Sequence, residues 1–241
     1  MPVLILGPKY SQDSKSLAAE AEASDWAVWR FEVPYIPDWV FDHEPVLYCG
    51  DIYAEFITQE LEITLATPND DALAGLSPEH LRRKVIFTKY QNFERPTERK
   101  FIKPADQKFF KAGIYEPDDE IPGLDKRKPE DPILISDVVE FVDEFRLFIV
   151  DGQVETGSQY IAEKQLLEDA ATDYLAAEIK SFGHAIAQVY QALLPRTYVV
   201  DIGRLVTGEL AVIEFNQIWA SGLYGASPKA VLNCLQYSVN K

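Results

Sequence analysis

The first 80 residues alternate between short apolar runs and segments in which apolar residues recur every three or four positions. The apolar runs predict strands and the periodic segments predict helices. The expected strands cover residues 2–7, 26–32 and 45–50, with a further strand or extended piece at 63–68, and the expected helices cover residues 14–25 and 52–61. Strands that alternate with helices are typical of a parallel sheet, so residues 1–80 predict a small, doubly wound α/β unit.

Between residues 81 and 141 the pattern changes to short strands separated by polar links. After a short helix at 77–84, the apolar spacing predicts strands at 85–90, 99–104 and 133–141, and a further short strand that ends near residue 115. The proline-containing stretch at 116–132 is polar and predicts an exposed loop. We expect this region to form a small subdomain of its own.

Hairpins and helices are predicted from the rest of the chain. In order, they are a hairpin at 144–162, a helix at 167–193, a hairpin at 197–217 and a closing helix at 227–239. Asp151-Gly152 is a dipeptide that favours tight hairpin turns, and Gly208 lies at the turn of the second hairpin. We expect the long helix to break near residues 181–183 and the closing helix to be capped by Ser227.

The amino-acid composition limits the binding partners and the cellular location that we expect. The chain carries 39 acidic and 23 basic residues, a net charge of −16, and 47% hydrophobic residues. The hydrophobic fraction is enough for a core, and the acidic balance argues against nucleic-acid and anionic-membrane partners. We expect no membrane span, because no apolar run reaches about 18 residues, and no signal peptide, because a basic leader is lacking. Cys49 and Cys234 lie in apolar surroundings, which predicts reduced core thiols and a cytoplasmic protein.

One stretch is basic within this acidic chain. Residues 82–103 contain eight basic and two acidic residues, and Lys108 and Lys111 follow closely. Lysine ammonium groups neutralise phosphate oxygens as compact charges. The stretch therefore predicts a site for a small anion, with phosphate as the expected anion. The alternative is a solvated basic surface.

Two carboxylates and an amide interrupt the apolar strands of the last hairpin, where the apolar residues at 211–215 predict a buried strand. Asp201 lies late in one strand, and Glu214 and Asn216 lie at alternate positions of the partner strand, which places both on one face. The hairpin can bring Asp201 alongside them. Carboxylate and amide oxygens suit Mg²⁺, which also takes ligands from water and substrate phosphates. The alternative is a strand whose polar residues face water.

An acidic hinge at residues 140–144 leads into the first hairpin. It contains Glu140, Asp143 and Glu144, and Arg146 follows. Backbone groups of such a hinge can bind an adenine edge while an acid binds the ribose hydroxyls. The planar guanidinium of Arg146 suits a phosphate or a carboxylate.

The order of these pieces resembles the ATP-grasp superfamily. The chain reads "IKP" at 102–104, "EFR" at 144–146, "VVDIG" at 199–203 and "IEFN" at 213–216. Within the superfamily it resembles the compact clade named for a conserved arginine and two lysines, which Arg146, Lys103 and Lys108 match. The resemblance to ribosomal-protein glutamate ligases is more distant. Many members carry a glycine-rich loop where residues 105–113 have one glycine, so lysines are expected to clamp the phosphates here.

The resemblance implies an ATP-grasp fold of class α/β (α+β). An N-terminal Rossmann-like subdomain at 1–80 would precede two α+β subdomains, at 81–141 and 142–241, that clamp ATP. The implied Mg²⁺ ligands are Asp201, Glu214 and Asn216. The implied ATP contacts are Lys103, Lys108, Glu140, Phe141, Val142, Glu144 and Arg146, with Arg146 and Lys108 catalytic. The upstream basic residue that usually contacts ATP stays open among Arg83, Lys84 and Lys89.

The implied activity is the ATP-dependent joining of a carboxylate to an amine through an acylphosphate, with Mg²⁺ as cofactor. The expected partners are small-molecule or peptide carboxylates and amines. An ATP-grasp phosphotransferase and a nucleotide-binding module without turnover stay open as alternatives. The sequence names neither the acyl donor nor the amine acceptor, and it leaves the oligomeric state open.

Overall fold

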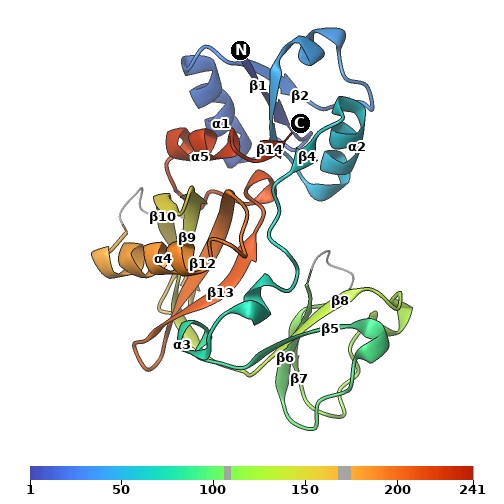
Figure 1. Cartoon of the computed structure of the whole chain (residues 1–241), viewed down its shortest axis with the longest axis vertical. Coiled ribbons are helices and arrows are strands. Elements are labelled where there is room, and N and C mark those ends of the chain that lie inside the picture. The colour runs from blue at the N-terminus through green and yellow to red at the C-terminus, as the bar shows by residue number, and fades with distance from the viewer. Residues whose placement is uncertain (106–109, 168–174, 241) are drawn as a thin grey trace.

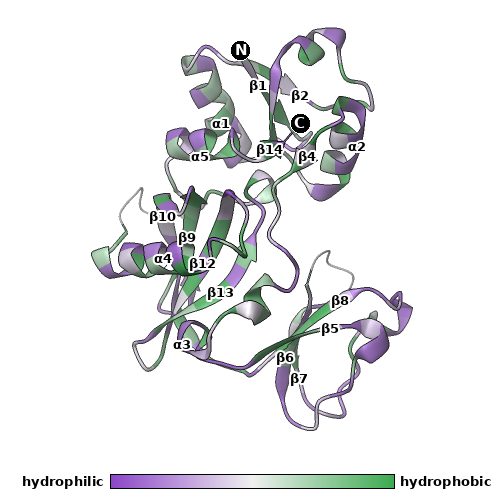
Figure 2. Ribbon diagram, in the orientation of Figure 1, coloured by the Kyte–Doolittle hydropathy of each residue, from purple (hydrophilic) through white to green (hydrophobic). Residues whose placement is uncertain are grey.

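Three sheets in separate lobes, joined by short connections, form the framework of the protein (Figure 1). The computed structural model describes residues 1–105, 110–167 and 175–240. Within these ranges the sheets have three, five and four strands, and a separate two-stranded pair involves the last described residues. Hydrophobic residues concentrate in the strands and in the helix faces that cover them (Figure 2).

The N-terminal lobe is the parallel α/β unit that the sequence predicts. Its strands are β1 (Pro2–Leu6), β2 (Ala27–Arg30) and β3 (Glu44–Tyr48), and its helices are α1 (Gln12–Ala23) and α2 (Asp51–Leu61). The strand order is β2-β1-β3, with every pair parallel. The helices lie on opposite sides of the sheet in Figure 1. The Ser11 hydroxyl accepts a hydrogen bond from the Ser14 amide and caps α1.

The C-terminal segment returns to this lobe and completes its core. Helix α5 (Pro228–Leu235) packs against α1, and β14 (Val239–Asn240) pairs with β4 (Thr64–Leu65). Val231 and Leu235 of α5 are fully buried in the same core as Leu17 of α1. The closing helix therefore stabilises the first lobe, although it follows the second hairpin in sequence.

The small lobe is an antiparallel sheet of four strands in the order β5-β8-β6-β7. The strands are β5 (Val85–Lys89), β6 (Lys100–Pro104), β7 (Gly113–Tyr115) and β8 (Pro132–Ser136). The predicted strand at 133–141 was too long, because β8 ends at Ser136. The expectation that 116–132 is wholly exposed was also wrong. Ile121 and Leu124 are buried against Ile102 and Ile133 and form the core of this lobe.

The large lobe is built on the two predicted hairpins. Its strands are β9 (Phe141–Val150), β10 (Gln153–Ala162), β11 (Gln165–Leu166), β12 (Thr197–Leu205) and β13 (Leu210–Asn216), in the order β11-β10-β9-β12-β13. The first turn has positive φ at Asp151 (47°) and Gly152 (74°), as the dipeptide predicts. Helix α4 (Ala177–Val189) packs on β9, β10 and β12.

The expected break in α4 near residues 181–183 was wrong, because the helix is continuous from Ala177 to Val189. Gly183 serves packing instead: a Cβ there would lie 2.4 Å from a methyl carbon of Leu147 on β9. Most of the preceding part of the predicted helix, residues 168–174, lies outside the described residues.

Short helices complete the described chain. The remaining α-helix is α3 (Pro78–Leu81), and the 3₁₀ turns are η1 (Asp38–Asp42), η2 (Ala72–Gly75), η3 (Tyr90–Asn92), η4 (Leu124–Lys126) and η5 (Ile218–Ala220). None of the helices in the described ranges combines the length and the apolar character that crossing a membrane requires. Both cysteines are buried free thiols, which confirms their predicted place in the core. The subdomain boundaries at residues 80 and 141 stay predictions.

Candidate functional site

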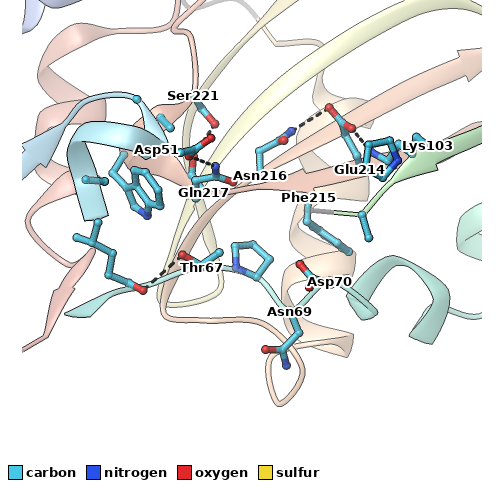
Figure 3. A pocket seen from close by; sticks show the side chains of 18 of the residues that line it. Asp51, Thr67, Asn69, Asp70, Lys103, Glu214, Phe215, Asn216, Gln217 and Ser221 are labelled. Atoms are coloured by element: carbon cyan, nitrogen blue, oxygen red, sulfur yellow. Dashed lines mark hydrogen bonds and ion pairs between the residues drawn. The ribbon is translucent and has the colours of Figure 1, made fainter. Parts of the chain in front are cut away.

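A cavity of about 1750 Å³ opens where the three lobes meet. Helix α2 and the connection that follows it form one wall, β6 and residues 110–112 form a second, and the end of β13 with the segment after it forms a third. Figure 3 shows this cavity, with Lys103, Glu214 and Asn216 close together. Among the described wall residues, the basic side chains are Lys103, Lys111 and Arg146.

The three predicted metal ligands meet at this cavity. Asp201 of β12 is paired in register with Glu214 of β13. The Asn216 Nδ2 lies 3.2 Å from the Asp201 Oδ2 and 3.1 Å from the Glu214 Oε1, so its amide donates to both carboxylates. Glu214 and Asn216 line the cavity, whereas Asp201 lies beneath them and is 1% exposed.

A bulge in β13 decides where Glu214 points. Asp201 is opposite Glu214, but the next residue, Ile202, is opposite Val212, so Ile213 is an extra residue. Val212 and Glu214 would share one face of a regular strand. The bulge lets Val212 face the core beside Ile202 while Glu214 faces the cavity with Asp201. Ile213 is only half-buried, so its predicted place in the core was wrong.

Arg146 and Asp201 form a buried, two-pronged ion pair. The Arg146 Nε lies 2.8 Å from Oδ1 and the Arg146 Nη2 lies 2.7 Å from Oδ2 of Asp201. Burial raises the pKa of Asp201 to about 6, while the hydrogen bonds and charge of Arg146 act in the opposite direction. Burial alone lowers the pKa of Arg146, but Asp201 outweighs it and raises that pKa above its ordinary value. The guanidinium therefore stays charged.

Two tyrosines enclose the Arg146 guanidinium. Its carbon lies 4.8 Å from the Tyr224 ring centre and 5.8 Å from the Tyr160 ring centre, and the two rings stack at 4.9 Å. The Tyr160 hydroxyl donates to Glu144 at 2.6 Å. Arg146 also donates to the carbonyl of Gly222 at 3.2 Å. These contacts hold the guanidinium plane in one orientation beside the cavity, which Arg146 and Tyr224 both line.

Lys103 of β6 reaches across the cavity to the predicted metal ligands. Its Nζ donates to the Glu214 Oε2 at 2.5 Å. Burial raises the pKa of Glu214, but the charge and hydrogen bond of Lys103, together with Asn216, outweigh it and lower the pKa overall. The carboxylate is therefore ionised at neutral pH.

The predicted hinge contacts lie away from the described wall of this cavity. Glu140 forms an exposed ion pair with Lys164, and the backbone carbonyl of Val142 accepts from the Lys164 amide at 2.8 Å. The Phe141 ring packs on Gly203, where a Cβ would lie 2.2 Å from its Cδ1. Glu144 is half-buried and accepts from Tyr160.

The other basic residues that the sequence singled out as ATP contacts are not described in the wall of the large cavity. Lys108 lies outside the described residues. Lys89 forms an exposed ion pair with Glu130, and Lys84 lines a smaller cavity. Arg83 donates to backbone carbonyls of β13. None of Arg83, Lys84 and Lys89 belongs to the described wall of the large cavity.

The chemistry of the donor set fits Mg²⁺. Asp201, Glu214 and Asn216 offer oxygen ligands only, which suit a hard cation that also keeps waters and takes substrate oxygens. Across the described ranges, no group of three or more His, Cys, Asp or Glu side chains is placed to hold a metal. A third oxygen ligand would then be the amide oxygen of Asn216, whose amide nitrogen faces both carboxylates in this structure.

Sequence reasoning missed the residues that support the site. Tyr160 and Tyr224 lie 14 and 78 positions after Arg146 in the sequence, and no local pattern marks them as its neighbours. The α2 wall of the cavity was also missed. There Asp51 accepts from Gln217 at 3.1 Å, which ties the segment after β13 to the first lobe.

A family comparison matches most of the two C-terminal lobes. The matching sequence model describes an ATP-grasp domain, family 2 of the clade named for one arginine and two lysines, and it covers residues 80–234. This range contains every predicted site residue. No curated protein sequence matches the chain.

Solved structures share the whole fold at low sequence identity. D-cycloserine synthetase DcsG has a TM-score of 0.63 and 14% identity, covering 98% of this chain and 99% of that chain. D-alanine–D-alanine ligase from Bacillus anthracis, complexed with ATP, has a TM-score of 0.56 and 14% identity, covering 98% and 96%. The ATP-grasp ligase PsnB, complexed with a minimal precursor, Mg and ADP, has a TM-score of 0.52 and 13% identity, covering 98% and 97%. The predicted ATP-grasp fold is confirmed.

Proposed function

The chain belongs to family 2 of the ATP-grasp clade named for one arginine and two lysines, and from this membership we propose that it is an ATP-dependent ligase that joins a carboxylate to an amine through an acylphosphate. ATP binding and ligation are supported at the level of the family. The acyl intermediate, the Mg²⁺ ion and the individual residue roles below are our proposal.

The observation that carries the proposal is the meeting of Lys103 with the Asp201, Glu214 and Asn216 set in one cavity. Lys103 comes from the small lobe and the other three come from the large lobe. A nucleoside triphosphate bound between the two sheets would meet the Lys103 ammonium on one side and the three oxygen-bearing side chains on the other. An exposed polar strand, the plain alternative for this set, does not account for a 1% exposed Asp201.

The proposed roles follow from charge and position. Asp201, Glu214 and Asn216 would hold Mg²⁺, which when bound neutralises charge on the β- and γ-phosphates. Lys103 would move from Glu214 to the α- and β-phosphates, and Lys108 would cover the β- and γ-phosphates. Arg146, anchored by Asp201, would stabilise charge on the transferring phosphoryl group or bind the acyl substrate.

The reaction needs no protein nucleophile. A substrate carboxylate oxygen attacks the γ-phosphorus, the bond to the β–γ bridging oxygen breaks, and ADP leaves. The amine then attacks the acyl carbon, inorganic phosphate leaves, and the amine proton passes to solvent. The chain contributes positioning and charge neutralisation. The adenine roles of Glu140, Phe141 and Val142 and the ribose role of Glu144 stay predictions from the resemblance, because these residues lie outside the described wall of the cavity and the Val142 carbonyl already accepts from the Lys164 amide.

The nucleotide site is tested by calorimetry with MgATP on the native chain, on the Glu214→Ala/Asn216→Ala double variant and on Lys103→Ala. We expect the native chain to bind and both variants to lose most of the affinity. A native chain that does not bind MgATP would contradict the site assignment.

The reaction class is tested by screening amino acids and peptides for phosphate release. With an ¹⁸O-labelled carboxylate, the acylphosphate route places one ¹⁸O in the released phosphate. A stable phosphorylated product without amine-dependent turnover indicates a phosphotransferase instead. Binding of MgATP without phosphate release in any mixture indicates a nucleotide-binding module.

A further inference from the structure

Arg83 is bound to the part of β13 that bulges beside the proposed metal site. Its Nη1 donates to the Val212 carbonyl at 2.7 Å and its Nη2 donates to the Ile213 carbonyl at 3.0 Å. The same Nη1 lies 3.0 Å from the carbonyl of Leu81, the last residue of α3. One guanidinium therefore ties the end of α3 to two successive peptide groups of β13.

Those peptide groups lie where the pairing of β12 with β13 is irregular. β13 is the edge strand of its sheet, and Val212 and Ile213 are the two residues that oppose Ile202 across the bulge. A bulge disrupts the ladder of hydrogen bonds, and a buried carbonyl without a donor is costly. The planar guanidinium of Arg83 presents several donors in a fixed geometry, and two of them reach these successive carbonyls at 2.7 and 3.0 Å.

The bulge controls the direction of the very next side chain. In a regular strand without the bulge, Glu214 would lie on the same face of β13 as Val212, which is fully buried in the core. With it, Glu214 lies opposite Asp201 and accepts from Lys103 and Asn216. A change that relaxes the bulge therefore moves one of the two carboxylates of the site.

Arg83 has a second anchor in the segment that joins the two lobes. Its guanidinium carbon lies 5.6 Å from the Phe141 ring centre, and that ring packs on Gly203. Burial lowers the pKa of Arg83 to about 10, with Asp137 and Glu214 acting in the opposite direction, so the side chain stays charged near neutral pH. It is thus held between α3, the start of β9 and β13.

We propose that Arg83 is a positioning residue for the metal site, which fixes the β13 bulge and thereby aims Glu214 at the bound cation, rather than a residue that contacts ATP. This inference rests on the proposed metal role of Glu214. It assigns one of the three upstream basic residues that the sequence left open.

The test compares Arg83→Gln with Arg82→Gln in the full chain. Arg82 is a matched control, because it is the neighbouring arginine but is exposed and pairs with Glu209 at the tip of the hairpin. Mn²⁺ is titrated in the presence of saturating ADP, with free Mn²⁺ followed by electron paramagnetic resonance. ADP binding is measured separately by calorimetry with EDTA. Both are done at a temperature where circular dichroism shows each variant to be folded.

We expect Arg83→Gln to raise the Kd for Mn²⁺ by about 10- to 100-fold, the usual effect of losing a residue that orients a metal ligand. ADP affinity without metal should stay within about twofold of the native value, and Arg82→Gln should change neither constant. If Arg83→Gln does not fold, Arg83→Lys, which keeps the charge but can satisfy fewer carbonyls, should show a smaller loss of Mn²⁺ affinity in the same direction.

Two results would overturn the inference alone. One is native Mn²⁺ affinity in the folded Arg83 variants. The other is an equal loss of ADP affinity in EDTA, which would make Arg83 a nucleotide contact. A native chain that binds neither ADP nor Mn²⁺ would instead overturn the proposed function, and this inference with it.

Discussion

The Lys103 ammonium lies 2.5 Å from the Glu214 carboxylate, and this ion pair joins the small lobe to the large lobe across the cavity. The two residues are 111 positions apart in the chain. In the proposed site this ion pair would break when MgATP binds. Lys103 would then contact phosphate oxygens, and Glu214 would contact Mg²⁺. In this structure the pair satisfies both charges.

Replacing Lys103 by methionine should weaken MgATP binding by about 10- to 100-fold, because a charge-assisted hydrogen bond contributes about 1.5–3 kcal/mol. Titration calorimetry measures this directly. Lys100→Met is the control, since Lys100 lies on the same strand but pairs with Glu98 and Asp137. Equal affinities of native chain and Lys103→Met would show that Lys103 does not contact the nucleotide.

Breaking the Arg146–Asp201 pair from one side should destabilise the fold strongly. Arg146→Met leaves a buried carboxylate without its partner, which costs about 3–5 kcal/mol. The double variant Arg146→Met/Asp201→Asn should lose less than Arg146→Met alone, because no uncompensated charge remains. Urea unfolding of these two variants, of Asp201→Asn and of the native chain gives the coupling energy. Additive losses would indicate that the pair is weaker than its geometry suggests.

Gly203→Ala should lower the free energy of unfolding by about 1–3 kcal/mol, the range for overpacking a core. The new methyl group would overlap the Phe141 ring, whose Cδ1 lies 2.2 Å from the Cβ position. The variant Gly203→Ala/Phe141→Leu should recover part of the loss, because the smaller side chain leaves room. Thermal unfolding checks both. A fully stable Gly203→Ala would mean that the ring moves without cost.

The thiol of Cys49 should resist alkylation in the folded protein even at pH 9. Burial raises its pKa to about 12, with Asp51 adding to the shift, so the reactive thiolate is scarce. Burial likewise raises the pKa of Cys234 to about 12. Reaction with a chromogenic disulfide should become fast only in denaturant. Rapid reaction of the native chain at pH 8 would contradict the burial of these residues.

Local patterns in the sequence determined most of the secondary structure. Apolar periodicity predicted the main strands of all three lobes, although not β11 or β14, and Asp151-Gly152 predicted a hairpin turn, because these signals act between residues close in the chain. Strand alternation placed Glu214 and Asn216 on one face, and the order of "IKP", "VVDIG" and "IEFN" indicated the family, whose resemblance assigned roles to Lys103 and to the predicted metal ligands. The errors at residues 181–183 and 116–132 arose where packing with distant residues overrides local propensity, as Gly183 against Leu147 and Ile121 against Ile102 show.

Only the tertiary structure decided how the site is assembled. The guanidinium of Arg83 meets a carbonyl 130 positions later, and Arg146 meets a carboxylate 55 positions later. The bulge at Ile213 exists in the pairing of β12 with β13, not in either strand alone. Helix α5 likewise finds its partner in α1, near the opposite end of the chain. Such contacts depend on which surfaces the fold brings together. Apolar spacing along the chain cannot predict them, because it reports only on residues that are close in the sequence.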